Sequence, residues 1–147
     1  MRIVCDTNVL VRAAIAPTGL ARELLRTIRT SHELALSLPI LAEVLDVLRR
    51  PKIQALHGLD ERGMRRFVTA LYKSATIVIV PQPVPSVVPH DPDDDAVLFT
   101  ALGGRADVLA TRDRHLLHAD IQAFAAQHGL RIMSDDALIS ELRRALP

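Results

Sequence analysis

Residues 2–8 read Arg-Ile-Val-Cys-Asp-Thr-Asn and decide the fold of this chain. Three consecutive apolar residues run directly into an aspartate, and a short, fully apolar run predicts a buried strand of a parallel sheet. In open sheets of this kind, ligands bind at the carboxyl ends of the strands. We therefore expect Asp6 to lie at the rim of the sheet and to face a crevice. The residues from Asp6 to Asn8 are also typical helix caps, so this stretch alone allows either role.

The composition restricts the class of protein. Of 147 residues, 49% are hydrophobic and 24% are charged, which predicts a globular chain with a single domain over residues 1–147. Aromatic residues make up only 3%, which argues against stacking platforms for single-stranded nucleic acid. The chain has one cysteine, no evident signal peptide and no apolar run of the roughly 20 residues that a membrane span needs. We therefore expect a cytoplasmic protein.

Charge is distributed unevenly along the chain. Residues 1–75 hold 12 Lys and Arg against 7 acidic residues, whereas residues 76–147 hold 6 against 10. This asymmetry predicts a basic surface beside an acidic site. The helical pattern groups several basic residues on outward faces, namely Arg22, Arg26 and Arg29 on one helix and Arg62, Arg65 and Arg66 on another.

Five short apolar runs alternate with helical patterns, which is typical of a doubly wound α/β protein with a parallel sheet. The predicted strands are 3–5, 34–38, 76–80, 107–111 and 130–133. The predicted helices are 20–30, 39–49, 61–73, a helix opened by the acidic run at 91–95, 121–128, and a last helix to about 145. The proline-rich residues 81–89 predict a stiff connector inside one domain.

Three acidic residues sit where such a fold brings side chains together. Asp113 follows a predicted strand just as Asp6 follows the first one. Glu43 lies in the helix 39–49 at the edge of its apolar arc, where a carboxylate can lean toward a neighbouring cleft. A surface glutamate that the helix dipole favours would show the same pattern.

The acidic run 91–95 opens the next helix. Measured from Asp94, apolar residues follow at three, four, seven and eight positions, so Asp94 lies on the inward face. Asp95 lies to one side of that face, and Asp93 faces away. An acidic helix start explains one or two acids, but this run has four.

If strands one and four are neighbours, Asp6, Glu43, Asp94 and Asp113 meet at one crevice. Clustered carboxylates repel one another by about 1–4 kcal/mol per pair, so the arrangement is reasonable only if cations fill it. Ligands that are all oxygen indicate Mg²⁺ or Mn²⁺. Such ions beside a basic surface suit the hydrolysis of a phosphodiester.

The chain resembles the PIN-domain ribonucleases, in particular the VapC-like toxins of bacterial toxin–antitoxin pairs. The resemblance covers essentially the whole chain, and its motifs occur in the expected order. The residues that carry it are Asp6-Thr7-Asn8-Val9-Leu10, Glu43 after Pro39, Asp93-Asp94-Asp95, and Thr111-Arg112-Asp113.

The resemblance implies a set of site residues. The metal ligands would be Asp6, Glu43, Asp113 and one aspartate of the run 93–95, with Asn8 and Thr111 as polar helpers. Helix register favours Asp94 for the third acid, whereas counting back from Asp113, as in some relatives, selects Asp95. Both aspartates therefore stay candidates at this point.

The resemblance also implies fold, activity and partners. It implies a three-layer α/β/α sandwich with strand order 3-2-1-4-5, a Mg²⁺-dependent endoribonuclease in which Mn²⁺ can substitute, a homodimer and a small cognate antitoxin. The uneven charge, independently of the resemblance, predicts that the basic first half binds the RNA backbone, through Arg22, Arg26, Arg29, Arg65 and Arg66, unless these form only a solvated arginine face.

Two other classes of protein remain as alternatives. A PIN-like interaction module with a degenerate site would lack activity, although all four acids are present. An aspartyl phosphotransfer domain also places an aspartate after strand one, but it needs a lysine near the later strands. This chain has no lysine after Lys73.

Overall fold

The computed structural model describes residues 1–89 and 91–146. Its sheet is five-stranded and all parallel, in the order β3-β2-β1-β4-β5, which confirms the predicted fold class and strand order. The strands are β1 Arg2–Cys5, β2 Glu33–Leu36, β3 Thr76–Ile77, β4 Val108–Ala110 and β5 Arg131–Met133.

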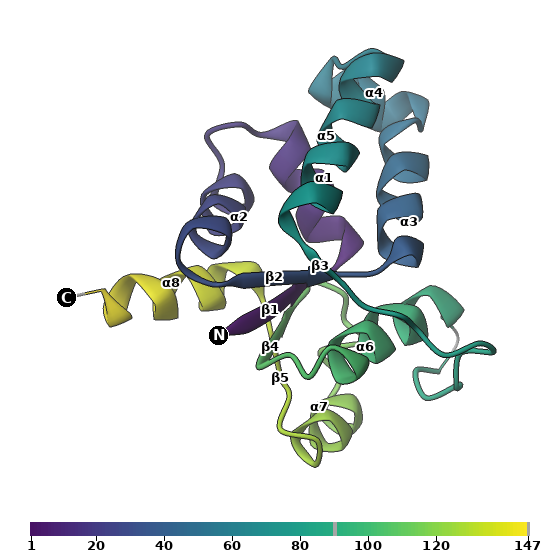
Figure 1. The fold of residues 1–147 in the computed structure, drawn as a ribbon, viewed down its shortest axis with the longest axis vertical. Coiled ribbons are helices and arrows are strands. Elements are labelled where there is room, and N and C mark those ends of the chain that lie inside the picture. The colour runs from purple at the N-terminus through teal and green to yellow at the C-terminus, as the bar shows by residue number, and fades with distance from the viewer. Residues whose placement is uncertain (90, 147) are drawn as a thin grey trace.

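Helices cover both faces of the sheet and make it a three-layer sandwich. Helices α1, α2, α3 and α5 lie over one face, α6 and α7 lie over the other, and α8 packs beside α2 at the edge (Figure 1). The helices are α1 Thr7–Ile15, α2 Leu20–Ser31, α3 Leu38–Leu48, α4 Pro51–His57, α5 Glu61–Ser74, α6 Pro92–Gly103, α7 Ala119–Ala126 and α8 Asp135–Ala145.

The central strand β1 explains where a ligand can bind. Ile3, Val4 and Cys5 are completely buried, because helices cover both sides of this strand. Ile3 lies opposite Leu34 of β2 on one side and Val108 of β4 on the other. The strand order reverses between β1 and β4, and a crevice opens beyond the carboxyl ends of strands at such a point. Asp6 directly follows β1 at this edge.

The third predicted strand, 76–80, is shorter than expected. After Ile77, only Val78 still reaches the sheet, where its N–H donates to the Leu36 carbonyl over 2.8 Å. The neighbouring strand β2 ends at Leu36 and the chain turns into α3, so the following residues have no ladder to join. Ile79 is accordingly 83% exposed.

Two helices, α1 and α4, were not among the predicted elements. α1 begins directly after Asp6, whose carboxylate accepts the Thr7 N–H, so Asp6 caps a helix as well as ending a strand. α4 begins at Pro51. Proline prevents the preceding helix from continuing, but it is also favourable at the first position of a new helix. Within the described residues, every helix is too short or too polar to cross a membrane.

Candidate metal centre

Four of the predicted acids converge on one cleft at the carboxyl edge of β1 and β4. Asp6, Glu43, Asp94 and Asp113 all line this cleft, which has a volume of about 360 Å³. They come from the end of β1, from α3, from the first turn of α6 and from the loop after β4. The structure therefore brings together the residues that the strand-end argument expected to meet.

A buried pair of hydroxyls holds two of these elements in place. Ser37, at the start of α3, and Thr100, on α6, are both fully buried, and their Oγ and Oγ1 atoms lie 2.7 Å apart. The Thr100 hydroxyl donates to the Ala96 carbonyl, so the Ser37 hydroxyl donates to Thr100. This contact fastens the helix that carries Glu43 to the helix that carries Asp94.

Asp6 is the most firmly held acid of the site. Its Oδ1 accepts the Thr7 N–H at 2.6 Å, and its Oδ2 accepts the Thr111 hydroxyl at 2.6 Å and the Asn8 amide at 3.2 Å. Its exposed fraction is 4%. Burial raises the Asp6 pKa to about 6, while the Thr111 and Thr7 hydrogen bonds oppose the rise, and the charges of Glu43 and Asp113 add to it.

Two threonines connect the acids to one another. Thr111 is fully buried, and its hydroxyl accepts the Asp113 N–H at 2.9 Å while it donates to Asp6. Thr7 donates its hydroxyl to Oε2 of Glu43 at 2.6 Å. This bond opposes the effect of burial, which raises the Glu43 pKa. Thr7 was not a predicted site residue, although it lies inside the Asp-Thr-Asn motif that could have indicated it.

The tightest group of carboxylates consists of Asp91, Asp94 and Asp113. One oxygen of each lies within 4.8 Å of the other two. Asp91 was not a predicted ligand; the signal that could have found it is its place in the acidic run, where it also accepts the Asp93 N–H as the cap of α6.

Asp94 provides the strongest evidence for a cation. It is 6% exposed, and its Oδ2 is one of three buried side-chain polar atoms without a hydrogen-bond partner in the described part of the chain. Burial raises the Asp94 pKa to about 8, and the charge of Asp113 contributes further. A buried oxygen without a partner is costly, and a bound cation would satisfy it. The all-oxygen set of donors fits Mg²⁺ or Mn²⁺.

Asp95 has a different environment from Asp94. Its Oδ1 accepts the N–H groups of Val87 and Val88 at 2.8 and 2.7 Å, which ties the proline-rich segment to α6. It is buried and does not line the cleft, whereas Asp93 lines its edge and is exposed. The structure thus places Asp94, and not Asp95, among the clustered acids.

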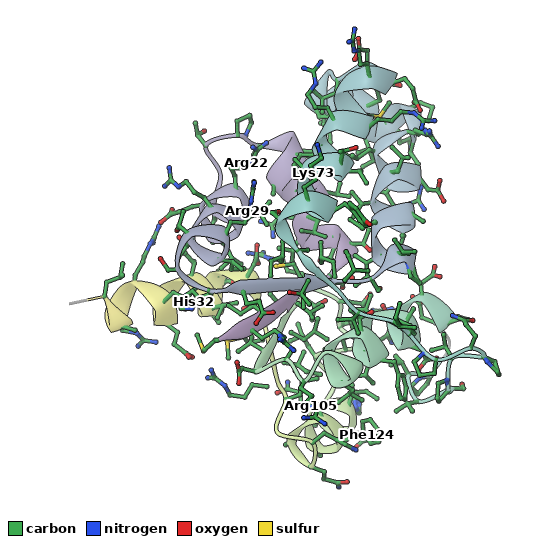
Figure 2. All side chains as sticks on the ribbon, viewed as in Figure 1. Arg22, Arg29, His32, Lys73, Arg105 and Phe124 are labelled. Carbon is green, nitrogen blue, oxygen red and sulfur yellow. The ribbon has the colours of Figure 1, made fainter. Side chains whose placement is uncertain are left out.

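The predicted RNA-binding arginines lie apart from the acids. Arg22, Arg26 and Arg29 line a groove of about 920 Å³ between α2 and α5. Figure 2 labels Arg22 and Arg29 on α2 and Lys73 on α5. The guanidinium of Arg22 donates to the Ala13 carbonyl at 2.7 Å and lies 5.6 Å from the Phe67 ring centroid.

The two remaining arginines lie on α5. Arg65 pairs with Glu61 of its own helix at 3.0 Å, and Arg66 is exposed. The structure therefore leaves Arg66 freer than Arg65 to meet an RNA backbone.

The fold and the carboxylate site together define the class of protein. The PIN domain family matches residues 2–115, and the chain belongs to this family. Among solved structures, a similar chain occurs in the crystal structure of VapBC2 from Rickettsia felis bound to a DNA fragment from their promoter. The TM-score is 0.61 at 14% identity, over 91% of this chain and 98% of that chain, which shows a shared fold. A comparison with curated protein sequences found no match.

Proposed function

We propose that this PIN-domain protein is a Mg²⁺-dependent endoribonuclease, in which Mn²⁺ can substitute for Mg²⁺. The observation that carries the proposal is the buried Oδ2 of Asp94, which lacks a partner in the described part of the chain and lies in the cluster with Asp91 and Asp113. An acidic cluster that is merely solvated would expose its oxygens to water. Here the geometry leaves one of them to be satisfied by an ion.

The residues that would hold the ion are the clustered Asp91, Asp94 and Asp113, together with Asp6 and Glu43, which line the same cleft. When bound, the ion would lower the pKa of a water molecule and stabilise negative charge on the phosphate. Asp95 is better explained as an anchor of the proline-rich segment, because its Oδ1 already accepts two backbone N–H groups.

The chain's own polar residues preorganise this site. Thr111 and Asn8 donate hydrogen bonds to the Oδ2 of Asp6, and Thr7 donates one to an oxygen of Glu43. Both carboxylates are therefore already oriented before an ion binds. Hydrogen bonds to metal-ligating side chains orient those side chains and raise the affinity of the site for the metal. The hydrogen bonds from Thr111 and from the Thr7 N–H lower the pKa of Asp6, and the bond from the Thr7 hydroxyl lowers the pKa of Glu43, so these bonds oppose the effect of burial.

We further propose that the protein acts in the cytoplasm as the toxin of a toxin–antitoxin pair. Membership of the PIN family and the similarity of fold to a VapBC2 chain support this role. The cognate partner would be a small antitoxin protein, and the homodimer and the RNA-binding role of the arginines belong to the same proposal. Induced expression should arrest growth with the wild-type chain and not with Asp94→Asn.

Cleavage of RNA by the purified chain tests the proposal directly. We expect cleavage of end-labelled RNA with Mg²⁺ or Mn²⁺, none with EDTA, and almost none with Asp94→Asn. Asp46→Asn is a matched control, because Asp46 is an exposed acid on α3 and does not line the cleft. Intact RNA with folded wild-type protein and either ion would exclude the nuclease and favour a non-catalytic module.

A separate experiment tests the basic groove. Charge reversal at Arg26 and Arg29 together should weaken RNA binding and flatten its dependence on salt, because fewer phosphates would be neutralised. Reversal at Arg105, an exposed arginine that does not line this groove, is the control. An unchanged salt dependence in the double variant would show that the groove arginines only solubilise the protein.

A further inference from the structure

Two arginines line the same cleft as the acids. Arg12, on α1, and Arg50, at the junction of α3 and α4, both border it. The side chain of Arg50 is exposed and forms no hydrogen bond or ion pair with any residue that the structure describes. The cleft therefore has both negative and positive walls, although its acids outnumber its arginines.

Arg12 is held by a completely buried carboxylate. Its Nη1 donates to Oδ2 of Asp135 at 2.6 Å, and Asp135 has no exposed surface. The other oxygen of Asp135 accepts Nε of Arg112 at 2.5 Å. Arg12 still keeps 39% of its side chain exposed, and its Nε and Nη2 donate to none of the described residues. This guanidinium is fixed at one end and available at the other.

We propose that Arg12 and Arg50 form a phosphate-binding subsite beside the acidic cluster, with Asp135 as the residue that positions Arg12. The inference rests on the proposed nuclease function and names the residues that bring a polyanion to a carboxylate-lined cleft. Such a cleft repels phosphates unless cations on its rim compensate. Arginine suits this task because its planar fork donates to two phosphate oxygens at once.

The ion pair with Asp135 does not by itself explain this arrangement. Arg112 already pairs with Asp135, and Arg50 borders the same cleft, where its charge lowers the pKa of Glu43. An anchored guanidinium also loses less side-chain entropy when it meets a phosphate. Asp135 also pairs with Arg112, the residue before Asp113, so one buried carboxylate holds both Arg12 and the segment that carries Asp113.

The test measures RNA binding separately from cleavage. The full chain carries Asp94→Asn to block cleavage, and fluorescence anisotropy follows a labelled, unpaired RNA of about 12 nucleotides in Mg²⁺ over about 50–300 mM salt. Arg12→Gln and Arg50→Gln should each weaken binding and reduce the slope of log affinity against log salt by about 0.7, the value for one lost phosphate contact on a single strand. Arg144→Gln is the control, because Arg144 is exposed in the last turn of α8 and lines none of the clefts.

Conservative variants separate a phosphate contact from a structural role. Arg12→Lys keeps the charge and should retain the slope of the parent protein. Asp135→Asn leaves both arginines charged, so it should keep the slope while raising KM for cleavage in the chain without Asp94→Asn. If Asp135→Asn fails to fold, Arg50→Gln still decides the question, since Arg50 has no structural partner among the described residues.

The subsite proposal is wrong if Arg12→Gln and Arg50→Gln both show the same slope of log affinity against log salt as the Asp94→Asn parent. It is also wrong if the Asp94→Asn parent does not measurably bind this RNA. A smaller slope of log affinity against log salt in Arg12→Lys than in the parent would also contradict the proposal. The nuclease proposal fails in a different experiment, when wild-type protein does not cleave RNA. Altered slopes without any cleavage would therefore retain the subsite and reject the nuclease.

Discussion

Asp94→Asn should stabilise the metal-free protein, and more so at higher pH. The Asp94 pKa lies at about 8 in the folded protein against 3.8 for an ordinary aspartate, mainly because of burial. Between these two values the folded chain holds a proton that the unfolded chain has released. The free energy of unfolding therefore falls as pH rises through this window. The contribution of the Asp94 proton to this free energy is fully present only below about pH 4. Asparagine cannot ionise, so the variant loses this component of the pH dependence.

The size of the effect follows from the slope of the linkage relation. One additional bound proton changes the free energy of unfolding by about 1.4 kcal/mol per pH unit, or about 3 kcal/mol between pH 5.5 and 7.5. Asp94 borders an open cleft, so water and ions screen part of this, and we expect about 1–2 kcal/mol. In a chain of 147 residues that corresponds to a difference in Tm of about 3–6 °C.

Thermal unfolding in EDTA at a series of pH values measures this difference. The wild-type Tm should fall more steeply with pH than that of Asp94→Asn, while Asp46→Asn, the exposed control on α3, should follow the wild type. Adding Mg²⁺ should remove much of the wild-type decline, because a cation replaces the proton on Asp94. Parallel lines for wild type and Asp94→Asn between pH 4.5 and 7.5 would refute the view that Asp94 is a buried acid in need of a cation.

Three further predictions concern the neighbours of Asp94. Saturating Mg²⁺ at about ten times its Kd should raise the wild-type Tm by about 3–5 °C, and Asp6→Asn should abolish that rise in calorimetry; an equal rise in both proteins would place the ion elsewhere. Thr111→Val should cost about 1.5–3 kcal/mol in urea unfolding and lower cleavage, because it removes a hydrogen bond to the buried Asp6 carboxylate, whereas Thr111→Ser should behave like wild type. Asp95→Asn should destabilise the fold by about 1–3 kcal/mol and leave substantial cleavage, while Asp94→Asn abolishes cleavage; the reverse pattern in a cleavage assay would assign the third ligand to Asp95.

The sequence predicted the sheet well because its central strands carry a simple signal. The apolar run at residues 3–5 is buried on both faces, and such strands need no alternation to be recognised. The strand expected at 76–80 was too long for a physical reason. Its apolar character is real, but its length is limited by β2, which ends at Leu36. Apolar composition thus predicts where a strand starts more reliably than where its neighbour leaves the sheet.

The two helices that were not predicted, α1 and α4, begin at residues that are compatible with two structural roles. Asp6 ends a strand and also caps α1, so its meaning as a strand-end acid obscured the helix behind it. Pro51 ends α3 and begins α4, so a residue that stops a helix was not recognised as one that also starts a helix. In both cases the local chemistry is compatible with two structures, and only the packing of the following residues decides.

The candidate site was predictable as far as it depends on periodicity and strand ends. Those arguments bring Asp6, Glu43, Asp94 and Asp113 to one cleft, where the structure also places them. The contacts that join the acids were not predictable, because they cross between elements far apart in the sequence. The bond from Thr7 to Glu43 spans 36 positions.

Asp135 shows the same limit of local patterns. From its local sequence, Asp135 can be assigned only to the start of the last helix, where an acid is common. Its pairing with Arg12 spans 123 positions, and no periodicity in either segment indicates it. Its complete burial between two guanidinium groups is therefore information that only the tertiary structure supplies.

The number of acids in the run 91–95 predicted a site, but it did not predict which of these acids line it. Four acids exceed what a helix start requires, and the structure gives them different environments. Asp91 caps α6 and joins the cluster, Asp93 stays exposed at the edge of the cleft, Asp94 turns inward, and Asp95 anchors the proline-rich segment. Adjacent helical positions differ by about 100°, so neighbours in one turn must face different surroundings. The excess of acids therefore marks a site, but helix geometry decides which of them can reach it.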